Sequence, residues 1–221
     1  MNLLSVLRDS LYFFRINLLA IVRLCLPLVV VETVVTQWVG QVGGDERAVY
    51  YDVLVGLLFY PLYTGALILF LDARSDGYSP SGRDLLATAL RLWPSFALLA
   101  GMSTLLIMLG MSLFLLPGLW VMVKLAFAEY LLVLHQLTPM AAMRQSFEMT
   151  RGHFWLIMGC VLAVLVPLWL LDGLVAQLLP APQPLWASLL LGSLSGFLQL
   201  FVSVVLFRLF MLVNESARPR P

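Results

Sequence analysis

Charged side chains are scarce in this chain. Lys, Arg, Asp and Glu make up 11% of its 221 residues, whereas hydrophobic residues make up 62%. Soluble proteins average roughly 25% charged residues, so this chain lacks the polar surface that contact with water requires. The composition excludes an ordinary soluble domain and predicts a protein whose surface is covered by lipid.

Cysteine, histidine and runs of basic residues are also rare. Cys25 and Cys160 lie inside apolar stretches, where a thiol acts as a small packing residue. His135 and His153 have no second ligand at metal-binding spacing. Basic residues form no continuous tract that would bind nucleic acid. We therefore expect no disulfide framework, no metal, no cofactor and no nucleic-acid partner.

Sequence motifs of catalysis are missing as well. The chain has no GxSxG elbow, HExxH helix, Walker loop or dinucleotide fingerprint. Its serine, histidine and aspartate residues do not fall in a pattern typical of a catalytic triad. We predict that the protein is not an enzyme.

Long apolar runs are what the chain does contain. A transmembrane helix needs about 20 mostly apolar residues, and six runs of about that length can be identified. Turn residues separate them, such as Pro117-Gly118 after the third and a proline-rich segment after the fifth. The sequence therefore predicts an all-α, polytopic membrane protein. Its predicted spans are residues 17–39, 49–71, 93–116, 119–135, 154–178 and 186–213.

Arginine is concentrated on one side of these spans. If six spans alternate in direction, nine arginines lie on the side of the two termini and only Arg47 lies on the other. By the positive-inside rule, the arginine-rich side is cytoplasmic. We predict a multi-pass protein of the bacterial inner membrane with both termini in the cytoplasm. The nine residues are Arg8, Arg15, Arg74, Arg83, Arg91, Arg144, Arg151, Arg218 and Arg220.

A short amphipathic stretch precedes each odd-numbered span. The stretches begin at residues 3, 81 and 138 and align on Arg15, Arg91 and Arg151, with Trp93 and Trp155 close behind two of these. We expect these residues to anchor three cytoplasmic interfacial helices in the headgroup layer. The chain is then one membrane domain with a threefold repeat, in units 1–71, 79–136 and 138–213. The alternative is that arginine and aromatic residues simply mark the cytoplasmic end of each span.

Four charged residues lie inside the predicted spans, where each costs about 2.5–3.5 kcal/mol on insertion. Arg23 and Glu32 belong to the first span, and Lys124 and Glu129 to the fourth. Because these spans run in opposite directions, Arg23 should lie level with Glu129, and Glu32 level with Lys124. We predict two ion pairs, Arg23–Glu129 and Glu32–Lys124. They either fix helix register or line a polar cavity for an anionic headgroup, a small solute or protons.

Two glycines of the sixth span, Gly192 and Gly196, are four residues apart. Small residues at this spacing allow two helices to approach closely. We expect them to be helix-packing positions, within the fold or in a dimer.

Residues 115–159 are the most distinctive part of the chain. The order of the sequence features in this segment resembles the signature of the YciC-like family of uncharacterised bacterial inner-membrane proteins. It is similar also to the membrane domain attached to some glycerophosphodiester phosphodiesterases, whose catalytic barrel has no counterpart in this sequence. The resemblance implies a multi-pass membrane protein and supplies no catalytic residues. The features that carry it are Pro117-Gly118, the apolar run 121–134, Ala142 with Ser146, and Arg151 with Phe154 and Trp155.

Two functions fit these features. The leading hypothesis is a non-enzymatic envelope protein that organises lipid or assists other membrane proteins; its partners are then membrane lipids, other inner-membrane proteins or a second copy. The alternative is a transporter or channel-like protein for a small or lipidic solute, indicated by charges and prolines inside the spans. A solvated cavity at the level of Arg23 and Glu129 would favour transport, whereas charges sealed in protein contacts would favour the first hypothesis.

Overall fold

The computed structural model describes residues 2–43, 48–178 and 184–217, which form helices joined by short turns, with no strand among them. Among the described residues, six stretches are long and apolar enough to cross a membrane. They overlap the six predicted spans, so the prediction of an all-α, six-span membrane protein is confirmed. The helices are α1 (Leu3–Gly43), α2 (Ala48–Ser75), α3 (Gly82–Leu113), α4 (Leu115–Leu125), α5 (Ala128–His135), α6 (Pro139–Met149), α7 (Phe154–Leu178) and α8 (Leu185–Ala217).

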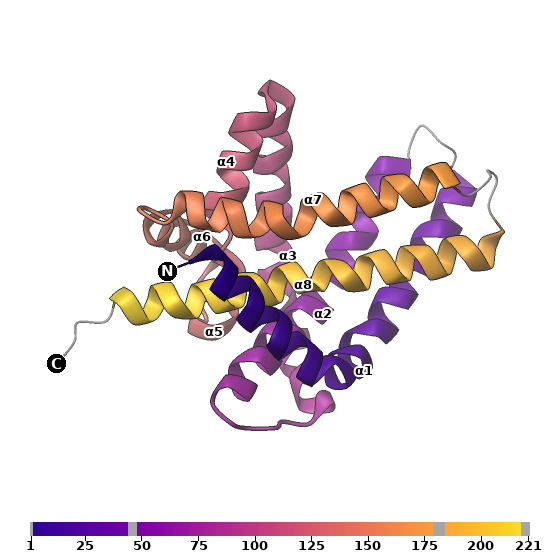
Figure 1. Ribbon diagram of the computed structural model, residues 1–221. Helices are drawn as coiled ribbons and strands as arrows, with labels where there is room; N and C mark the ends of the chain where they lie inside the picture. The colour runs from indigo at the N-terminus through magenta and orange to yellow at the C-terminus, as the bar shows by residue number, and fades with distance from the viewer. Residues whose placement is uncertain (1, 44–47, 179–183, 218–221) are drawn as a thin grey trace.

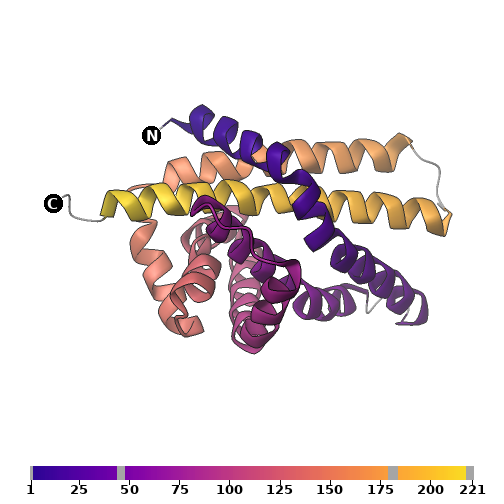
Figure 2. The ribbon, with the colours of Figure 1, turned by 90° about the horizontal axis from the view of Figure 1, so that it is seen from below.

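The helices point in two main directions. Helices α7 and α8 lie side by side as an antiparallel pair, and α1 crosses this pair (Figures 1 and 2). Helices α3 and α4 form a second antiparallel pair that rises steeply away from α7 and α8 (Figure 1). The tip of this α3–α4 hairpin therefore stands apart from the rest of the bundle. Helices α5 and α6 lie near the end at which α1 begins and α8 ends (Figure 1).

The buried core lies where α2, α5 and α8 meet. Tyr130 of α5 stacks on Phe210 of α8, with the ring centroids 5.6 Å apart, and Phe127 contacts the same ring edge-on. Ile68 of α2 and Leu131 of α5 are fully buried in the same cluster. The α3–α4 tip, in contrast, exposes most of its large apolar side chains. Such a surface is expected where the solvent is lipid rather than water.

The three amphipathic stretches differ in how they join their spans. The first and second continue without a break into the spans of α1 and α3, whereas the third is a separate helix, α6. The separation follows from Gly152, whose positive φ of 84° turns the chain before α7. Of the three predicted interfacial helices, only the third is therefore a helix separate from its span, and the placement of all three in the headgroup layer stays a prediction. Ser81 caps α3 by accepting a hydrogen bond from the Asp84 backbone N–H at 3.3 Å.

The predicted anchor residues lie near the start of their spans. Arg15, Arg91, Arg151 and Trp155 are exposed. Trp93 is half-buried and donates its indole N–H to the Leu58 carbonyl of α2 at 2.9 Å, so this ring also joins α3 to α2.

The turn between the third and fourth spans comes earlier than predicted. Helix α3 ends at Leu113, Phe114 is extended, and Pro117 and Gly118 lie in the first turn of α4. Proline is tolerated there because the first N–H groups of a helix have no intrahelical partner. The Pro117-Gly118 pair is therefore not the turn itself. The proline-rich segment between the fifth and sixth spans lies outside the described residues, apart from Pro184.

Glycines hold the α3–α4 hairpin together. A Cβ on Gly110 would lie 2.9 Å from the Gly118 Cα, closer than Cβ atoms approach their neighbours in proteins. A Cβ on Gly101, which comes earlier in α3, would meet the methyl groups of Leu57 at 3.6 and 3.8 Å, which are ordinary contacts. The two positions therefore offer a matched comparison of a tight and a spacious glycine on one helix.

We expect Gly110→Ala to destabilise the protein by about 1–3 kcal/mol, because the added methyl group forces the two helix backbones apart. Gly101→Ala should be neutral or slightly stabilising, since alanine favours helix. Thermal unfolding in detergent micelles, followed by tryptophan fluorescence, measures both variants. Equal unfolding midpoints for the two variants would contradict the close packing.

Candidate functional site

The fourth span is broken in its middle. Helix α4 ends at Leu125 and α5 begins at Ala128, which leaves backbone groups without their helical partners at the break. Ser146 of α6 supplies new partners: its hydroxyl donates to the Lys124 carbonyl at 2.7 Å and accepts from the Phe127 N–H at 3.1 Å. Ser146 is completely buried. This residue of the 115–159 signature therefore stabilises a discontinuous membrane helix.

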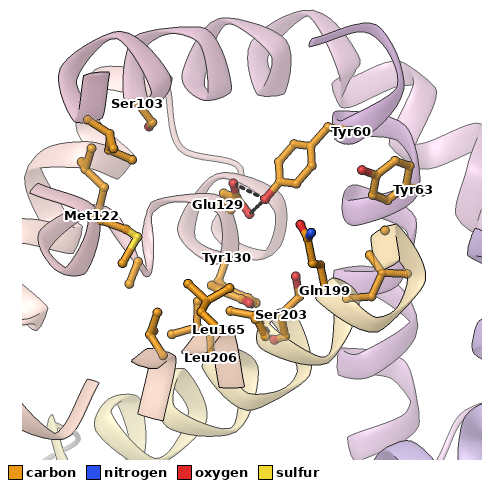
Figure 3. Close-up of a pocket in the computed structure, with 17 residues that line it drawn as sticks. Tyr60, Tyr63, Ser103, Met122, Glu129, Tyr130, Leu165, Gln199, Ser203 and Leu206 are labelled. Atoms are coloured by element: carbon orange, nitrogen blue, oxygen red, sulfur yellow. Dashed lines mark hydrogen bonds between the residues drawn. The ribbon is translucent and has the colours of Figure 1, made fainter. Parts of the chain in front are cut away.

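The break places Glu129 in the first turn of α5, facing a cavity (Figure 3). The Tyr60 hydroxyl of α2 donates to its carboxylate, at 2.8 Å from Oε1 and 3.0 Å from Oε2. The free N–H groups at the start of a helix also favour negative charge nearby. The Tyr60 hydroxyl therefore fixes the Glu129 carboxyl group at the start of α5, at the edge of the cavity.

Two adjoining cavities, each of about 320 Å³, meet at Glu129. Both are lined by Tyr60, Ser103, Ile107 and Glu129, so α2, α3 and α5 contribute to both. The first extends to α4, α7 and α8, and the second extends to α1. The cavities therefore lie between the α3–α4 hairpin and the rest of the bundle.

Polar groups from several helices reach into this space. Gln199 of α8 points its amide into the first cavity, toward Tyr60 and Glu129 (Figure 3). Ser203 lines the same cavity, where its backbone carbonyl accepts the Tyr130 hydroxyl at 2.7 Å. Three tyrosines, two serines, a glutamine and a glutamate thus line a cavity inside the membrane spans.

The second cavity contains another carboxylate, that of Glu32. Its Oε1 lies 3.8 Å from the position of a Cβ on Gly56, an ordinary contact, so the carboxylate packs beside this residue of α2. Tyr63 lies within electrostatic range of Glu32, and its ring meets the Tyr60 ring edge-on at 5.7 Å. Each carboxylate is therefore accompanied by a tyrosine of α2. No lysine, arginine or histidine is among the described residues that line either cavity.

Neither predicted ion pair is formed. Arg23 is exposed. It lies beside Pro80 of the α2–α3 connection and Gly82 at the start of α3, and the hollow that it lines there does not include Glu129. Among the described residues, the ion pairs are Arg144–Glu148 at 3.7 Å and Arg208–Asp9 at 3.5 Å. The prediction assumed parallel, unbroken spans. The break and the tilted α3–α4 hairpin change which faces of the first and fourth spans meet.

Lys124 is buried away from both cavities. Its ammonium group lies 5.9 Å from the Trp120 ring centroid and 6.0 Å from that of Phe154, which opens α7. The faces of aromatic rings attract cations, so these two rings take the place of the predicted carboxylate partner. Lys124 therefore lies beside the first residue of the fifth span and not beside Glu32.

Gly192 and Gly196 face α1 within the fold. A Cβ on Gly192 would lie 2.9 Å from a Thr33 methyl, and one on Gly196 would lie 3.0 Å from a Val29 methyl. Gly196 also lines the first cavity. Gly196 thus belongs both to the close contact between α8 and α1 and to the wall of the first cavity.

None of the residues predicted from the sequence to form a site is Tyr60, Tyr63, Ser103 or Gln199. A usable signal existed in the second span, where Tyr60 and Tyr63 are separated by three positions and share one helix face. Single polar residues such as Ser103 and Gln199 give no comparable signal, since most such residues in membrane helices serve packing.

Comparison with known proteins places the chain in a family. Residues 47–212 match the uncharacterised protein family UPF0259. Similar proteins occur in Yersinia pestis strain Pestoides F and Yersinia pseudotuberculosis serotype O:1b, both named as UPF0259 membrane proteins. Each is 27% identical over 164 residues, covering 74% of this chain and 62% of the relative. The chain thus matches less than two thirds of the length of these relatives, and no solved structure matches it.

These matches confirm the resemblance to the YciC-like proteins and the assignment to a membrane. The matched residues include α3 to α7 in full, and with them the broken fourth span and Glu129. The chain belongs to the UPF0259 family, as a multi-pass membrane protein with six membrane-spanning segments.

Proposed function

We propose that this protein binds a small solute or lipid headgroup that carries an ammonium group, and transports it through the cavities at Glu129. The observation that carries the proposal is the Glu129 carboxylate, held by the Tyr60 hydroxyl at 2.8 Å in a cavity whose described lining residues include no lysine, arginine or histidine. A charged residue inside a membrane is costly and is usually functional. An ammonium ligand would supply the missing positive charge.

The site offers an ammonium group three kinds of contact. Glu129 and Glu32 supply negative charge, and Ser103 and Gln199 supply oxygen acceptors. The rings of Tyr60, Tyr63 and Tyr130 supply aromatic faces that attract cations. Together these groups select a cation over an anion or a neutral solute.

The broken fourth span provides a means of opening the site. The α3–α4 hairpin is bounded by the connection before Gly82 and by the break at Ala126 and Phe127. In many transporters, discontinuous helices meet at the substrate site and one unit rocks against another. Movement of this hairpin as a rigid body would expose the cavities to one side of the membrane and then to the other. This scheme requires no covalent step, so we propose that the protein is not an enzyme.

A panel of small molecules tests the proposal. Ethanolamine and choline are the cationic probes, acetate is the anionic probe and glycerol is the neutral probe. Binding to the folded state raises its thermal unfolding midpoint in proportion to the logarithm of ligand concentration. We expect the two cations to raise the midpoint and the other two probes to have no effect. Stabilisation by acetate alone, or by none of the four probes, would oppose the proposal.

A second candidate function is the organisation of lipid or assistance to other membrane proteins. It is favoured by the first turns of α1, where Leu4, Leu11 and Tyr12 are exposed at 78%, 48% and 69%. An exposed amphipathic segment of this kind responds to headgroups or to a partner. Mass spectrometry of the protein in native lipid nanodiscs separates the two functions: a recurrent protein partner with only bulk lipid would favour this second one.

The proposed location is the bacterial inner membrane, with both termini in the cytoplasm. The Asp9–Arg208 pair brings the beginning of α1 and the end of α8 to the same side of the protein. Arg15, Arg91 and Arg151 are exposed, and by the positive-inside rule we propose that the ends of the spans that carry them face the cytoplasm. Arg47, Arg218 and Arg220, which entered the prediction, lie outside the described residues.

Reporter fusions check this orientation. Green fluorescent protein fused to the C-terminus should fluoresce, because it folds in the cytoplasm, whereas alkaline phosphatase at the same site should be inactive. Alkaline phosphatase inserted after Leu178, at the far end of α7, should be active. The opposite result at both sites would reverse the proposed orientation.

A further inference from the structure

A second site lies away from the Glu129 cavities, where the first turns of α1 meet the end of α8. It is a hollow of about 590 Å³ whose lining includes Arg8, Asp9, Asp76, Arg208 and Glu215. Asp9 and Arg208 pair at 3.5 Å. Of the other described residues that line the hollow, Arg8 is the one cation, and Asp76 and Glu215 are the carboxylates. The hollow is therefore equipped for a ligand that carries both charges.

Ser10 gives independent evidence of a ligand in this hollow. Its side chain lines the hollow and only 1% of the residue is exposed. Its hydroxyl has no hydrogen-bond partner among the described residues. A buried hydroxyl without a partner costs free energy, and native proteins rarely leave one unsatisfied. A polar ligand in the hollow would supply the partner.

An apolar groove of about 560 Å³ adjoins the hollow. Leu4, Leu7 and Leu11 of α1 form one wall, and Pro167 of α7 and Phe201 of α8 lie on the others. Arg8 lines both the hollow and the groove, so the charged and apolar spaces meet at this residue. A single molecule with a charged end and a hydrocarbon end could therefore occupy both spaces.

We propose that these two spaces bind one phospholipid whose headgroup carries a phosphate and an ammonium group. Its phosphate lies against Arg8 and accepts from the Ser10 hydroxyl. Its ammonium group lies against Asp76 and Glu215. One acyl chain fills the groove between α1, α7 and α8. This site is separate from the proposed transport site and does not depend on it.

Charge complementarity selects this headgroup among bilayer lipids. The hollow holds two arginines and three carboxylates, so an anionic headgroup such as phosphatidylglycerol would add negative charge to an acidic site. Phosphatidylethanolamine instead places one positive group beside Asp76 and Glu215, which form no ion pair with another described residue. Like charges in a partly desolvated site repel strongly, and opposite charges attract.

Native mass spectrometry tests the site, with the full chain in nanodiscs that contain equal amounts of phosphatidylethanolamine and phosphatidylglycerol. We expect one phosphatidylethanolamine molecule to be retained per protein. Arg8→Gln should reduce this retention on the order of tenfold, the loss expected for one charge-assisted contact. Ala163→Trp should reduce it as well, because Ala163 is exposed within the groove and indole would occupy the acyl space.

The matched control is Arg144→Gln. Arg144 is a highly exposed arginine on α6 and does not line the hollow. This variant should retain phosphatidylethanolamine as the unaltered protein does. Retention of the two lipids in the ratio of the nanodisc, or equal losses for Arg8→Gln and Arg144→Gln, would overturn the proposal.

Discussion

Replacing Glu129 with glutamine is expected to weaken the binding of ammonium probes strongly while leaving the protein folded. Glutamine has the size of glutamate and its carbonyl still accepts the Tyr60 hydroxyl, so the cavity wall keeps its shape. Only the negative charge is lost. A hydrogen bond to a charged group contributes roughly 1.5–3 kcal/mol, so the affinity for ethanolamine should fall by about 10- to 150-fold. The shift in unfolding midpoint with ethanolamine concentration measures this affinity.

Two further variants make this prediction specific. Glu148→Gln is the control, because Glu148 is an exposed carboxylate on α6 that pairs only with Arg144. Its affinity for ethanolamine should equal that of the unaltered protein. Tyr60→Phe keeps the aromatic ring but removes the hydroxyl that holds Glu129, and should give an intermediate loss. If Glu129→Gln and Glu148→Gln bind ethanolamine equally, the cavity is not the binding site.

Replacing Ser146 with alanine is expected to destabilise the protein strongly. The substitution leaves the Lys124 carbonyl and the Phe127 N–H without the hydroxyl that pairs them, in a position closed to water. Each unsatisfied buried group costs roughly 1–3 kcal/mol. The free energy of unfolding, measured by titration with a denaturing detergent, should fall by about the sum of the two costs.

Ser112→Ala is the matched control for this experiment. Ser112 is an exposed serine of α3 whose hydroxyl donates only to the Leu109 carbonyl of its own helix, at 2.8 Å. Its removal should change the free energy of unfolding by no more than about 0.5 kcal/mol, as for most surface substitutions. Similar losses for Ser146→Ala and Ser112→Ala would show that the break does not depend on Ser146.

The six spans could be predicted from the sequence because each depends on local properties. A run of about 20 apolar residues has few alternatives to a membrane helix. The fifth span illustrates this, since the predicted residues 154–178 are those of α7. The threefold repeat, which concerns relations between distant segments, stays a prediction.

The site could not be predicted in the same way because it depends on long-range contacts. Ser146 and Lys124 are separated by 22 residues, and no pattern around Lys124 alone signals that its carbonyl is bound from α6. A fourth span that is one straight helix would place Glu129 level with Arg23, and the break between α4 and α5 makes this prediction wrong. The actual partner of Glu129, Tyr60, lies 69 residues away on a helix whose rotation is set by packing.

Labelling of a Ser103→Cys variant tests whether the space at Glu129 is open to water and binds ammonium compounds. Ser103 lines both cavities, and Thr64 on α2 is fully buried and serves as the core control. Each is replaced by cysteine in a protein whose Cys25 and Cys160 are alanine. We expect a water-soluble cationic thiol reagent to label the cysteine of Ser103→Cys and ethanolamine to slow this labelling, whereas the cysteine of Thr64→Cys should stay unlabelled. Equal, slow labelling at both positions, unaffected by ethanolamine, would show that the space at Glu129 is sealed and would contradict the proposed binding site.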